Sequence, residues 1–222
     1  MSAGILHGPK GNPRVHKVLI TAKLSSIPID HDQTFELGKD NKTPDYLAKF
    51  PLGQVPAFEI KDGPVLTESN AIAFYVASLK ENNPLLGKGK DELAKIYQYS
   101  FMVETQVVSQ AVNILLPNWG KLPYDETLVN GAYEKLESMF EYLNKEIAGK
   151  KYLVGDHLTL ADIFVCANLN FIYKYILIEE KRNKVPNLTN YYLAYRAIPE
   201  IKELEGEVQL ALSQPKPGDK MH

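Results

Sequence analysis

The sequence has 222 residues, enough for one large domain or two small ones. Hydrophobic residues make up 45% and charged residues 23%, close to globular averages, which excludes disorder over most of the chain. The 25 basic and 27 acidic residues leave a formal charge of −2, which argues against a nucleic-acid-binding protein, since such proteins normally carry a basic stripe.

The first 80 residues alternate short apolar runs with helical patterns. Strands are predicted at 4–7, 27–33, 57–60 and 65–67, and helices at 14–24, from Pro44 onward, and at 69–80. Thr43 and Ser69 are the residue types that favour the N-cap position. The order β-α-β-α-β-β-α predicts a small mixed sheet with helices on its faces, so the fold class of this part is α/β.

The remainder is predicted to be all-helical, after a linker at 81–88. Helices are expected at 91–116, where Pro117 ends the pattern, and then at 124–147, 159–178, 188–196 and 199–212. The domains are therefore expected at 1–80 and 89–212. The last residues, 213–222, are rich in proline and lysine and are expected to be a disordered tail.

Neither a secretory signal nor a membrane span is expected. Residues 1–8 are short and are followed at once by Pro9 and Lys10. The most apolar stretch, 158–178, contains Asp162 and other polar residues that are costly at a bilayer centre, so a buried core helix is favoured. The single cysteine, Cys166, excludes a disulfide within the chain and fits a reducing compartment.

Residues 158–163 carry the sharpest helix-start signal in the sequence. Thr159 is an N-cap residue, and Asp162 lies three positions on, where its carboxylate reaches back to the cap N–H. Leu158 and Ile163 are then the pair that forms a hydrophobic staple. The pattern predicts a structural role, and Asp162→Ala is expected to cost about 0.5–2 kcal/mol.

The segment 54–57 places Pro56 directly before an apolar strand. A cis bond between Val55 and Pro56 would expose the Val55 amide and carbonyl, with which an extended peptide could pair as an added strand. A plain loop proline is the commoner alternative, because cis is only about 5–6% of X–Pro bonds.

At 67–72 a predicted strand ends and a helix begins. Ser69 either caps that helix or, with the amides that follow it, holds an external carboxylate. Glu68 is placed to pair with a ligand ammonium, so the two residues together suggest a site for an amino-acid head group. A self-capped helix is the more common case.

The histidines and the cysteine give no sign of a metal site. Cys166 lies in an apolar run and is expected to be a small buried hydrophobe. The five histidines show no metal-ligand spacing; they are His7, His16, His31, His157 and His222.

Taken together, these motifs resemble the glutathione transferase superfamily over about residues 3–205. The resemblance implies a thioredoxin-like N-terminal domain followed by an all-helical C-terminal domain. The sequence is most similar to the transferase-like domain of the elongation factor 1B gamma subunit. That similarity is carried by the segments 41–44, 50–58, 67–73, 152–155 and 158–162.

The resemblance also implies a glutathione site and no separate cofactor, glutathione being a substrate. The implied contacts are those of Val55 and cis-Pro56 with the cysteinyl backbone, of Glu68 and Ser69 with the γ-glutamyl end, and of Lys42 with nearby Gln54 at the glycyl carboxylate.

The implied reaction is attack of the glutathione thiolate on an electrophile. A thiol with a pKa of about 8.5 is mostly protonated at neutral pH, so the protein must stabilise the thiolate. The tyrosine that often ends the first strand in this subgroup is replaced by His7, and 8–14 contains no serine or tyrosine. Among the remaining donors, which include His7 and Lys10, Asn12 and Arg14 match the subgroup and are expected to take this role.

Two function classes stay open. One is a cytoplasmic glutathione transferase, and the other is a non-catalytic or weakly catalytic interaction module that docks the nucleotide-exchange subunit of the elongation factor. A complete product of 222 residues would favour the enzyme and a trimmed chain the module. Family members usually form symmetric homodimers, here expected to pair the helix at 71–80 with the partner's helix at 91–116.

Overall fold

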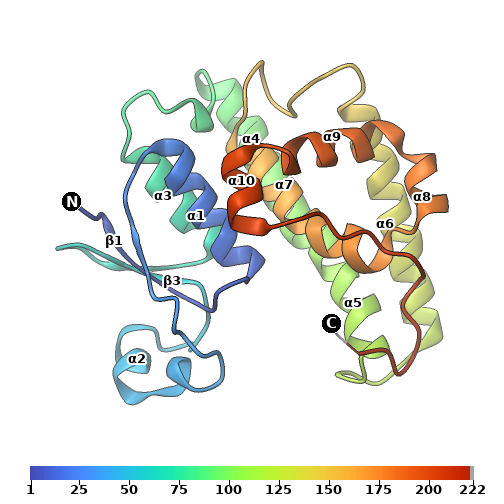
Figure 1. Ribbon diagram of the computed structural model, residues 1–222, viewed down its shortest axis with the longest axis horizontal. Coiled ribbons are helices and arrows are strands. Elements are labelled where there is room, and N and C mark those ends of the chain that lie inside the picture. Colours follow the sequence, from blue (N-terminus) through green and yellow to red (C-terminus); the bar gives the residue numbers. More distant parts are fainter. Residues whose placement is uncertain (221–222) are drawn as a thin grey trace.

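The computed structural model describes residues 1–220. Met221 and His222, the end of the predicted tail 213–222, lie outside the described residues. A thioredoxin-like α/β domain is followed by an all-helical domain, and the two lie side by side with α1 and α3 between the sheet and the helical bundle (Figure 1). The predicted fold class is confirmed.

The sheet of the first domain has the strand order β2-β1-β3-β4. Its strands are β1 (Gly4–His7), β2 (Asp30–His31), β3 (Ala57–Ile60) and β4 (Val65–Thr67). β1 pairs parallel with β2 and antiparallel with β3, and β3 pairs antiparallel with β4. The expected strand at 27–33 was too long, because Pro28 has no N–H to give to a ladder and the Asp32 side chain caps a turn by accepting from the Thr34 amide.

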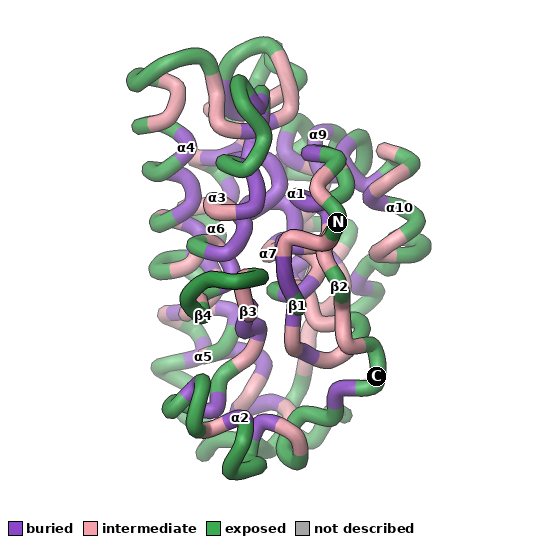
Figure 2. The backbone as a smooth tube through the Cα atoms, turned by 90° about the vertical axis from the view of Figure 1, so that its left-hand side faces the viewer, coloured by how far each residue is buried: buried purple, intermediate pink, exposed green. Residues whose placement is uncertain are grey.

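Helices cover both faces of this sheet. α1 (Pro13–Ser25) and α3 (Ser69–Ser78) pack on the face that carries Leu6 and Phe58. α2 (Pro44–Lys49) covers the other face, and its predicted cap is confirmed, since the Thr43 hydroxyl accepts from the Tyr46 amide. Buried residues lie along one side of most helices and in the central strands β1 and β3, whereas the outer loops are exposed (Figure 2).

The second domain is a bundle around one nearly fully buried helix, α7 (Leu160–Phe171). α4 (Lys90–Met102) and α9 (Pro186–Arg196) pack on it, and α5 (Ser109–Asn118) packs on α6 (Glu126–Glu146) in the same bundle. Two π-helical segments interrupt the α-helical pattern, at Val103–Val108 between α4 and α5 and at Ile172–Ile176 after α7. None of the helices in residues 1–220 is long and apolar enough to cross a membrane.

The ends of several helices differ from the sequence pattern. Pro117 lies inside the last turn of α5, because a proline there removes only one intrahelical hydrogen bond. A short helix that the pattern did not predict, α8 (Glu179–Lys184), precedes α9. α10 (Pro199–Glu205) ends at Gly206, whose φ of 71° is left-handed, so the expected helix at 199–212 stops there.

Asp162 confirms the predicted capping box and extends it. Its carboxylate accepts from the Thr159 amide at 2.8 Å and the Thr159 hydroxyl at 3.0 Å. It also accepts from the Leu153 amide at 2.8 Å and the Tyr191 hydroxyl at 2.7 Å. Burial raises the pKa of Asp162, and the four hydrogen bonds oppose that shift. One side chain therefore fastens α7, the preceding loop and α9 together.

The predicted division into domains, with its linker and tail, stays a prediction. Within the expected linker, Asn83 donates from its side-chain amide to the Ser25 hydroxyl and to the Ala77 carbonyl, both at 2.8 Å. In the expected tail, the Gly218 amide donates to the Asn118 carbonyl at 2.9 Å.

Candidate functional site

Three segments meet at one end of the sheet. In the strand register His7 pairs with Ala57, and Ala57 pairs with Thr67. The loop after β1, the residues before β3 and the start of α3 therefore lie next to one another. A Cβ at Gly8 would lie 3.7 Å from atoms of both Val55 and Pro56. This edge is where the sequence analysis placed the glutathione site.

The backbone of Val55 is free to pair with a ligand. The Val55–Pro56 bond is cis, as the resemblance implies. Within residues 1–220 the amide and carbonyl of Val55 make no hydrogen bond. The preceding residue is fixed in place, because the Tyr46 hydroxyl donates to the Gln54 carbonyl at 2.7 Å.

The start of α3 is not self-capped, so of the two alternatives for Ser69 the capping role is excluded. Glu68 takes the cap position with a φ of 66°, and its exposed side chain makes no capping hydrogen bond. Ser69 is the first helical residue, only 6% exposed, and its hydroxyl has no hydrogen-bond partner in the described part of the chain. Free N–H groups at the positive end of a helix favour an anion such as a carboxylate.

Lys42 lies beside the segment that carries Gln54. The Asn41 side-chain amide donates to the Gly53 carbonyl at 2.7 Å, which joins the two loops. A Cβ at Gly53 would lie 3.7 Å from the Lys42 ammonium nitrogen. Lys42 and Gln54 are both exposed, so a cationic and an amide side chain are available together at this rim.

Asn12 and Arg14 lie at the start of α1. Asn12 is the N-cap, and its side-chain oxygen accepts from the Arg14 amide at 2.8 Å. Both residues line a cavity of about 260 Å³. Its other walls come from α5 and the residue after it, α7, and the π-helical segment Val103–Val108. Those walls are mostly apolar: Val108, Ala111, Val112, Leu115, Leu116, Trp119, Asn168 and Phe171.

No motif in the sequence marks this apolar cavity. Five of its apolar residues, between Val108 and Leu116, lie in the helix predicted at 91–116, and their spacing also fits an ordinary core-facing stripe. An apolar pocket next to a few polar groups is the usual form of a small-molecule site.

His7 points to the opposite face of the sheet. Its ring nitrogen Nε2 lies 2.8 Å from Glu59 Oε1, and its ring packs edge-on against Tyr46 at 6.0 Å. Burial raises the pKa of Glu59, but hydrogen bonds from Lys49 and His7 outweigh it and hold that pKa below its usual range. His7 therefore contacts α2 and β3. Asn12 and Arg14 lie together at the start of α1, and His7 does not line their cavity.

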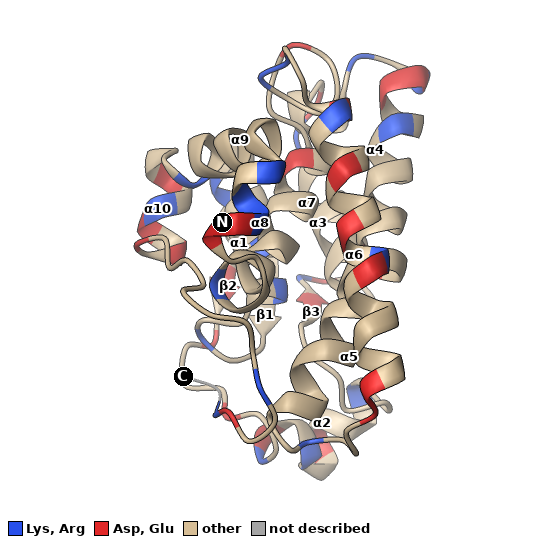
Figure 3. Cartoon of the chain, turned by 90° about the vertical axis from the view of Figure 1, so that its right-hand side faces the viewer, with Lys and Arg blue, Asp and Glu red and all other residues tan. Residues whose placement is uncertain are grey.

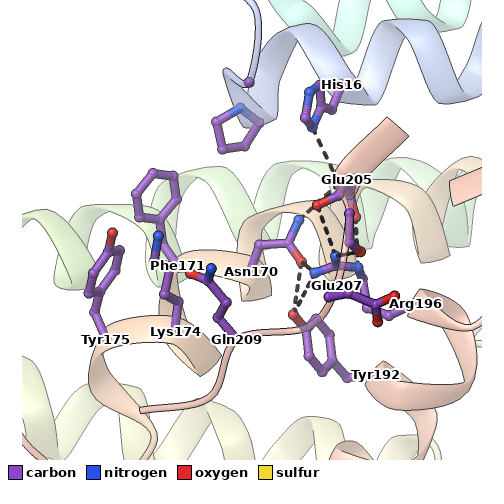
Figure 4. Close-up of a pocket in the computed structure, with 13 residues that line it drawn as sticks. His16, Asn170, Phe171, Lys174, Tyr175, Tyr192, Arg196, Glu205, Glu207 and Gln209 are labelled. Atoms are coloured by element: carbon purple, nitrogen blue, oxygen red, sulfur yellow. Dashed lines mark hydrogen bonds and ion pairs between the residues drawn. The ribbon is translucent and has the colours of Figure 1, made fainter. Parts of the chain in front are cut away.

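A second cavity, of about 470 Å³, lies between the start of α1, the end of α7, α9 and the segment after α10 (Figure 4). Its polar floor is a buried ion pair between Arg196 and Glu205, 3.0 Å apart, to which Asn170 and Tyr192 are hydrogen-bonded. Arg196 also donates to the Gly206 carbonyl at 3.0 Å, so the cluster fastens the end of α10.

Charges on the outer surface are mixed. Figure 3 shows basic and acidic positions interspersed along the ribbon in that view, without a continuous run of basic positions. Among residues 1–220 there is no group of three or more His, Cys, Asp or Glu side chains placed to hold a metal ion.

Two family models match this chain. Residues 2–78 match the glutathione S-transferase N-terminal domain, and residues 96–199 match the glutathione S-transferase C-terminal domain. A glutathione S-transferase-like protein from Fusarium, LUC7, is 36% identical over 208 residues, which are 93% of this chain and 94% of that protein.

Elongation factor subunits are equally similar in sequence. Elongation factor 1-gamma 1 of Oryza sativa subsp. japonica is 36% identical over 212 residues, which are 96% of this chain and 50% of that protein. The chain thus spans about half the length of the elongation factor relatives it matches. The crystal structure of the GST-like domain of elongation factor 1-gamma from Saccharomyces cerevisiae superposes with a TM-score of 0.83 at 21% identity and covers 100% of both chains.

Proposed function

This chain belongs to the glutathione S-transferase family, and on that premise we propose that it is a cytoplasmic enzyme that transfers the glutathione thiolate to small electrophiles. The observation that carries the proposal is the cavity at the start of α1. Arg14 and Asn12 line it, and its other walls are mostly apolar.

Each part of glutathione then has a matching group. The γ-glutamyl carboxylate accepts from the Ser69 hydroxyl and the free amides of α3, and Glu68 faces the γ-glutamyl ammonium. The cysteinyl backbone pairs with the amide and carbonyl of Val55. Lys42 and Gln54 meet the glycyl carboxylate, which leaves the thiol at the start of α1.

The chemistry follows from that placement. The positive end of α1 and the guanidinium of Arg14 favour the ionised thiol, and Asn12 adds a hydrogen bond from its side-chain amide. The apolar cavity holds the electrophile close to the sulfur and away from water. Attack forms a carbon–sulfur bond, and the leaving group departs with the electron pair of the bond that breaks.

We expect Glu68→Ala and Ser69→Ala each to weaken glutathione binding by roughly tenfold or more. The loss of a hydrogen bond to a charged ligand group costs about 1.5–3 kcal/mol, and about 1.4 kcal/mol is a factor of ten. Calorimetric titration with glutathione measures this. The control is Ser78→Ala at the other end of α3, where the hydroxyl only donates to the Tyr75 carbonyl and the affinity is expected to stay at the wild-type value. Unchanged affinity in both test variants would show that glutathione does not bind at the start of α3.

The second candidate function is the interaction module. It is favoured by about 35% identity to elongation factor 1-gamma chains over 95% or more of this sequence. In that case the chain docks the nucleotide-exchange subunit of the factor and conjugates glutathione slowly or not at all. The conjugation rate of the wild-type protein with a generic aromatic halide separates the two candidates.

We also propose a symmetric homodimer in which α3 of one subunit faces α4 of the other. Three aromatic rings lie together on this surface, where Phe74 is partly buried and Tyr97 and Phe101 are exposed. Phe74 of α3 lies 4.8 Å from Tyr97 of α4, and Tyr97 stacks on Phe101 at 6.1 Å. Phe101 is 64% exposed, which is unusual for a phenylalanine unless a partner covers it.

The variant Phe101→Asp is expected to shift the protein from dimer to monomer at micromolar concentration, because it places a charge in an apolar interface. Light scattering gives the mass. Leu128→Asp on α6 changes an exposed leucine in the same way, away from the proposed interface, and is expected to remain dimeric. A monomeric wild-type protein would refute the proposal.

A further inference from the structure

A lysine is buried between the two domains. Lys17 of α1 is 0% exposed, and its ammonium group donates to the Asn70 side-chain oxygen at 2.8 Å and to the Glu104 carboxylate. The ring of Phe164 lies on another side, with its centroid 5.6 Å from the lysine nitrogen. Glu104 also accepts from the Asn168 side-chain amide at 3.0 Å. One network therefore joins four polar side chains: Lys17 of α1, Asn70 of α3, Asn168 of α7 and Glu104 of the π-helical segment Val103–Val108.

Burying these charged groups lowers the folding stability unless each of them keeps its partner. Burial lowers the pKa of Lys17, and the carboxylate of Glu104 opposes that shift. Burial likewise raises the pKa of Glu104, but Lys17 and Asn168 outweigh it and hold that pKa below its usual range. Removing one partner of a buried pair leaves an uncompensated charge. The two residues therefore hold the N-terminal domain and the helical domain in one relative position.

The network adjoins two parts of the proposed glutathione site, the start of α3 and the cavity lined by Arg14. Asn70 directly follows Ser69 in the first turn of α3. Asn168 lines the apolar cavity together with Arg14. The charge of Arg14 is close enough to lower the pKa of Glu104 further. Lys17 is hydrogen-bonded to Asn70, and Glu104 is hydrogen-bonded to Asn168.

We propose that Lys17 and Glu104 are positioning residues for glutathione. Their ion pair fixes the first turn of α3, through Asn70, against the start of α1 and against α7. The carboxylate site at Ser69 and the thiolate donor Arg14 then keep the separation that one glutathione molecule spans. This inference rests on the proposed function, and neither residue is required to touch glutathione.

The test measures glutathione affinity and unfolding free energy for Lys17→Met, for Glu104→Gln and for the double variant. Both single variants are expected to bind glutathione about tenfold more weakly, with KM rising more than kcat falls. The control is Lys23→Met. Lys23 of α1 also pairs across the domain boundary, with Glu203 of α10, but the pair is exposed and lies away from the site, so affinity is expected to stay at the wild-type value.

The pH dependence separates the two single variants. In Glu104→Gln the buried ammonium loses the carboxylate charge that opposes its desolvation and keeps only neutral side-chain acceptors, with the charges of Glu68 and Arg14 nearby. The folded state then binds fewer protons than the unfolded state, so its unfolding free energy rises as pH approaches the ordinary lysine value of 10.5. Lys17→Met has no group to titrate there and is expected to lack this rise.

The double variant separates positioning from stability. Removing both charges together is expected to restore much of the unfolding free energy. The glutathione affinity is not expected to recover, because Asn70 still lacks its hydrogen bond from Lys17. Recovery of wild-type affinity in the double variant, or wild-type affinity in both folded single variants, overturns the inference. A wild-type protein that does not bind glutathione at all overturns the proposed function instead.

Discussion

Replacing Arg14 with alanine is expected to slow glutathione conjugation by up to about thirtyfold at pH 7. A thiol with a pKa of about 8.5 is only about 3% ionised at that pH, so full thiolate stabilisation is worth about a factor of thirty. Arg14 is permanently charged and lies at the positive end of α1, on the wall of the cavity. We therefore expect it to be the strongest thiolate-stabilising group of the proposed site.

The pH–rate profile checks this assignment. Asn12→Ala is the comparison, because Asn12 is neutral and its side-chain oxygen already accepts from the Arg14 amide. The loss in Arg14→Ala is expected to exceed the loss in Asn12→Ala. It is expected to shrink as the pH rises past about 8.5, where solvent supplies the thiolate. A loss independent of pH would keep the enzyme but take Arg14 out of this role.

Replacing Asp162 with alanine is expected to lower the unfolding free energy by about 3–5 kcal/mol. The sequence suggested about 0.5–2 kcal/mol for a capping box alone. The structure adds two donors from outside the box, the Leu153 amide and the Tyr191 hydroxyl. Each buried donor left without an acceptor costs about 1–3 kcal/mol, and partial relaxation reduces the sum.

Urea unfolding measures this, with Asp156→Ala as the matched control. Asp156 also accepts from two side chains, Lys88 and His157, but it is exposed, so its removal is expected to shift the midpoint little. Glutathione affinity of the folded Asp162→Ala protein is expected to stay at the wild-type value. A wild-type midpoint in this variant would contradict the role of Asp162 as a fastening point.

The sequence predicted local features whose residue types have few alternatives. Thr43-Pro44 begins a helix because it joins a capping side chain to a proline at the first helical position. Helix periodicity identified α6 and α9, and strand patterns identified β3 and β4. The cis bond before Pro56 could not be predicted from its own residues and came from the family resemblance.

Features set by tertiary contacts could not be predicted. Ser69 is a good capping residue, yet the left-handed backbone at Glu68 moves the helix start by one residue. The pairing of Lys17 with Glu104 joins residues 87 positions apart, and one half of it lies in a π-helical segment that ordinary helix periodicity does not show. His7 was a candidate thiolate donor because of its place in the sequence, and only the structure shows its ring bound to Glu59.

The most direct measurement is a pH titration of the ultraviolet thiolate absorbance of glutathione bound to the wild-type protein. It reports at once whether glutathione binds and whether its thiol is activated. Binding at the sheet edge next to Arg14 predicts a bound thiol that ionises well below its free pKa of about 8.5, with the shift reduced in Arg14→Ala. Bound glutathione that ionises at its free pKa, or no saturable thiolate signal, would contradict the proposed function.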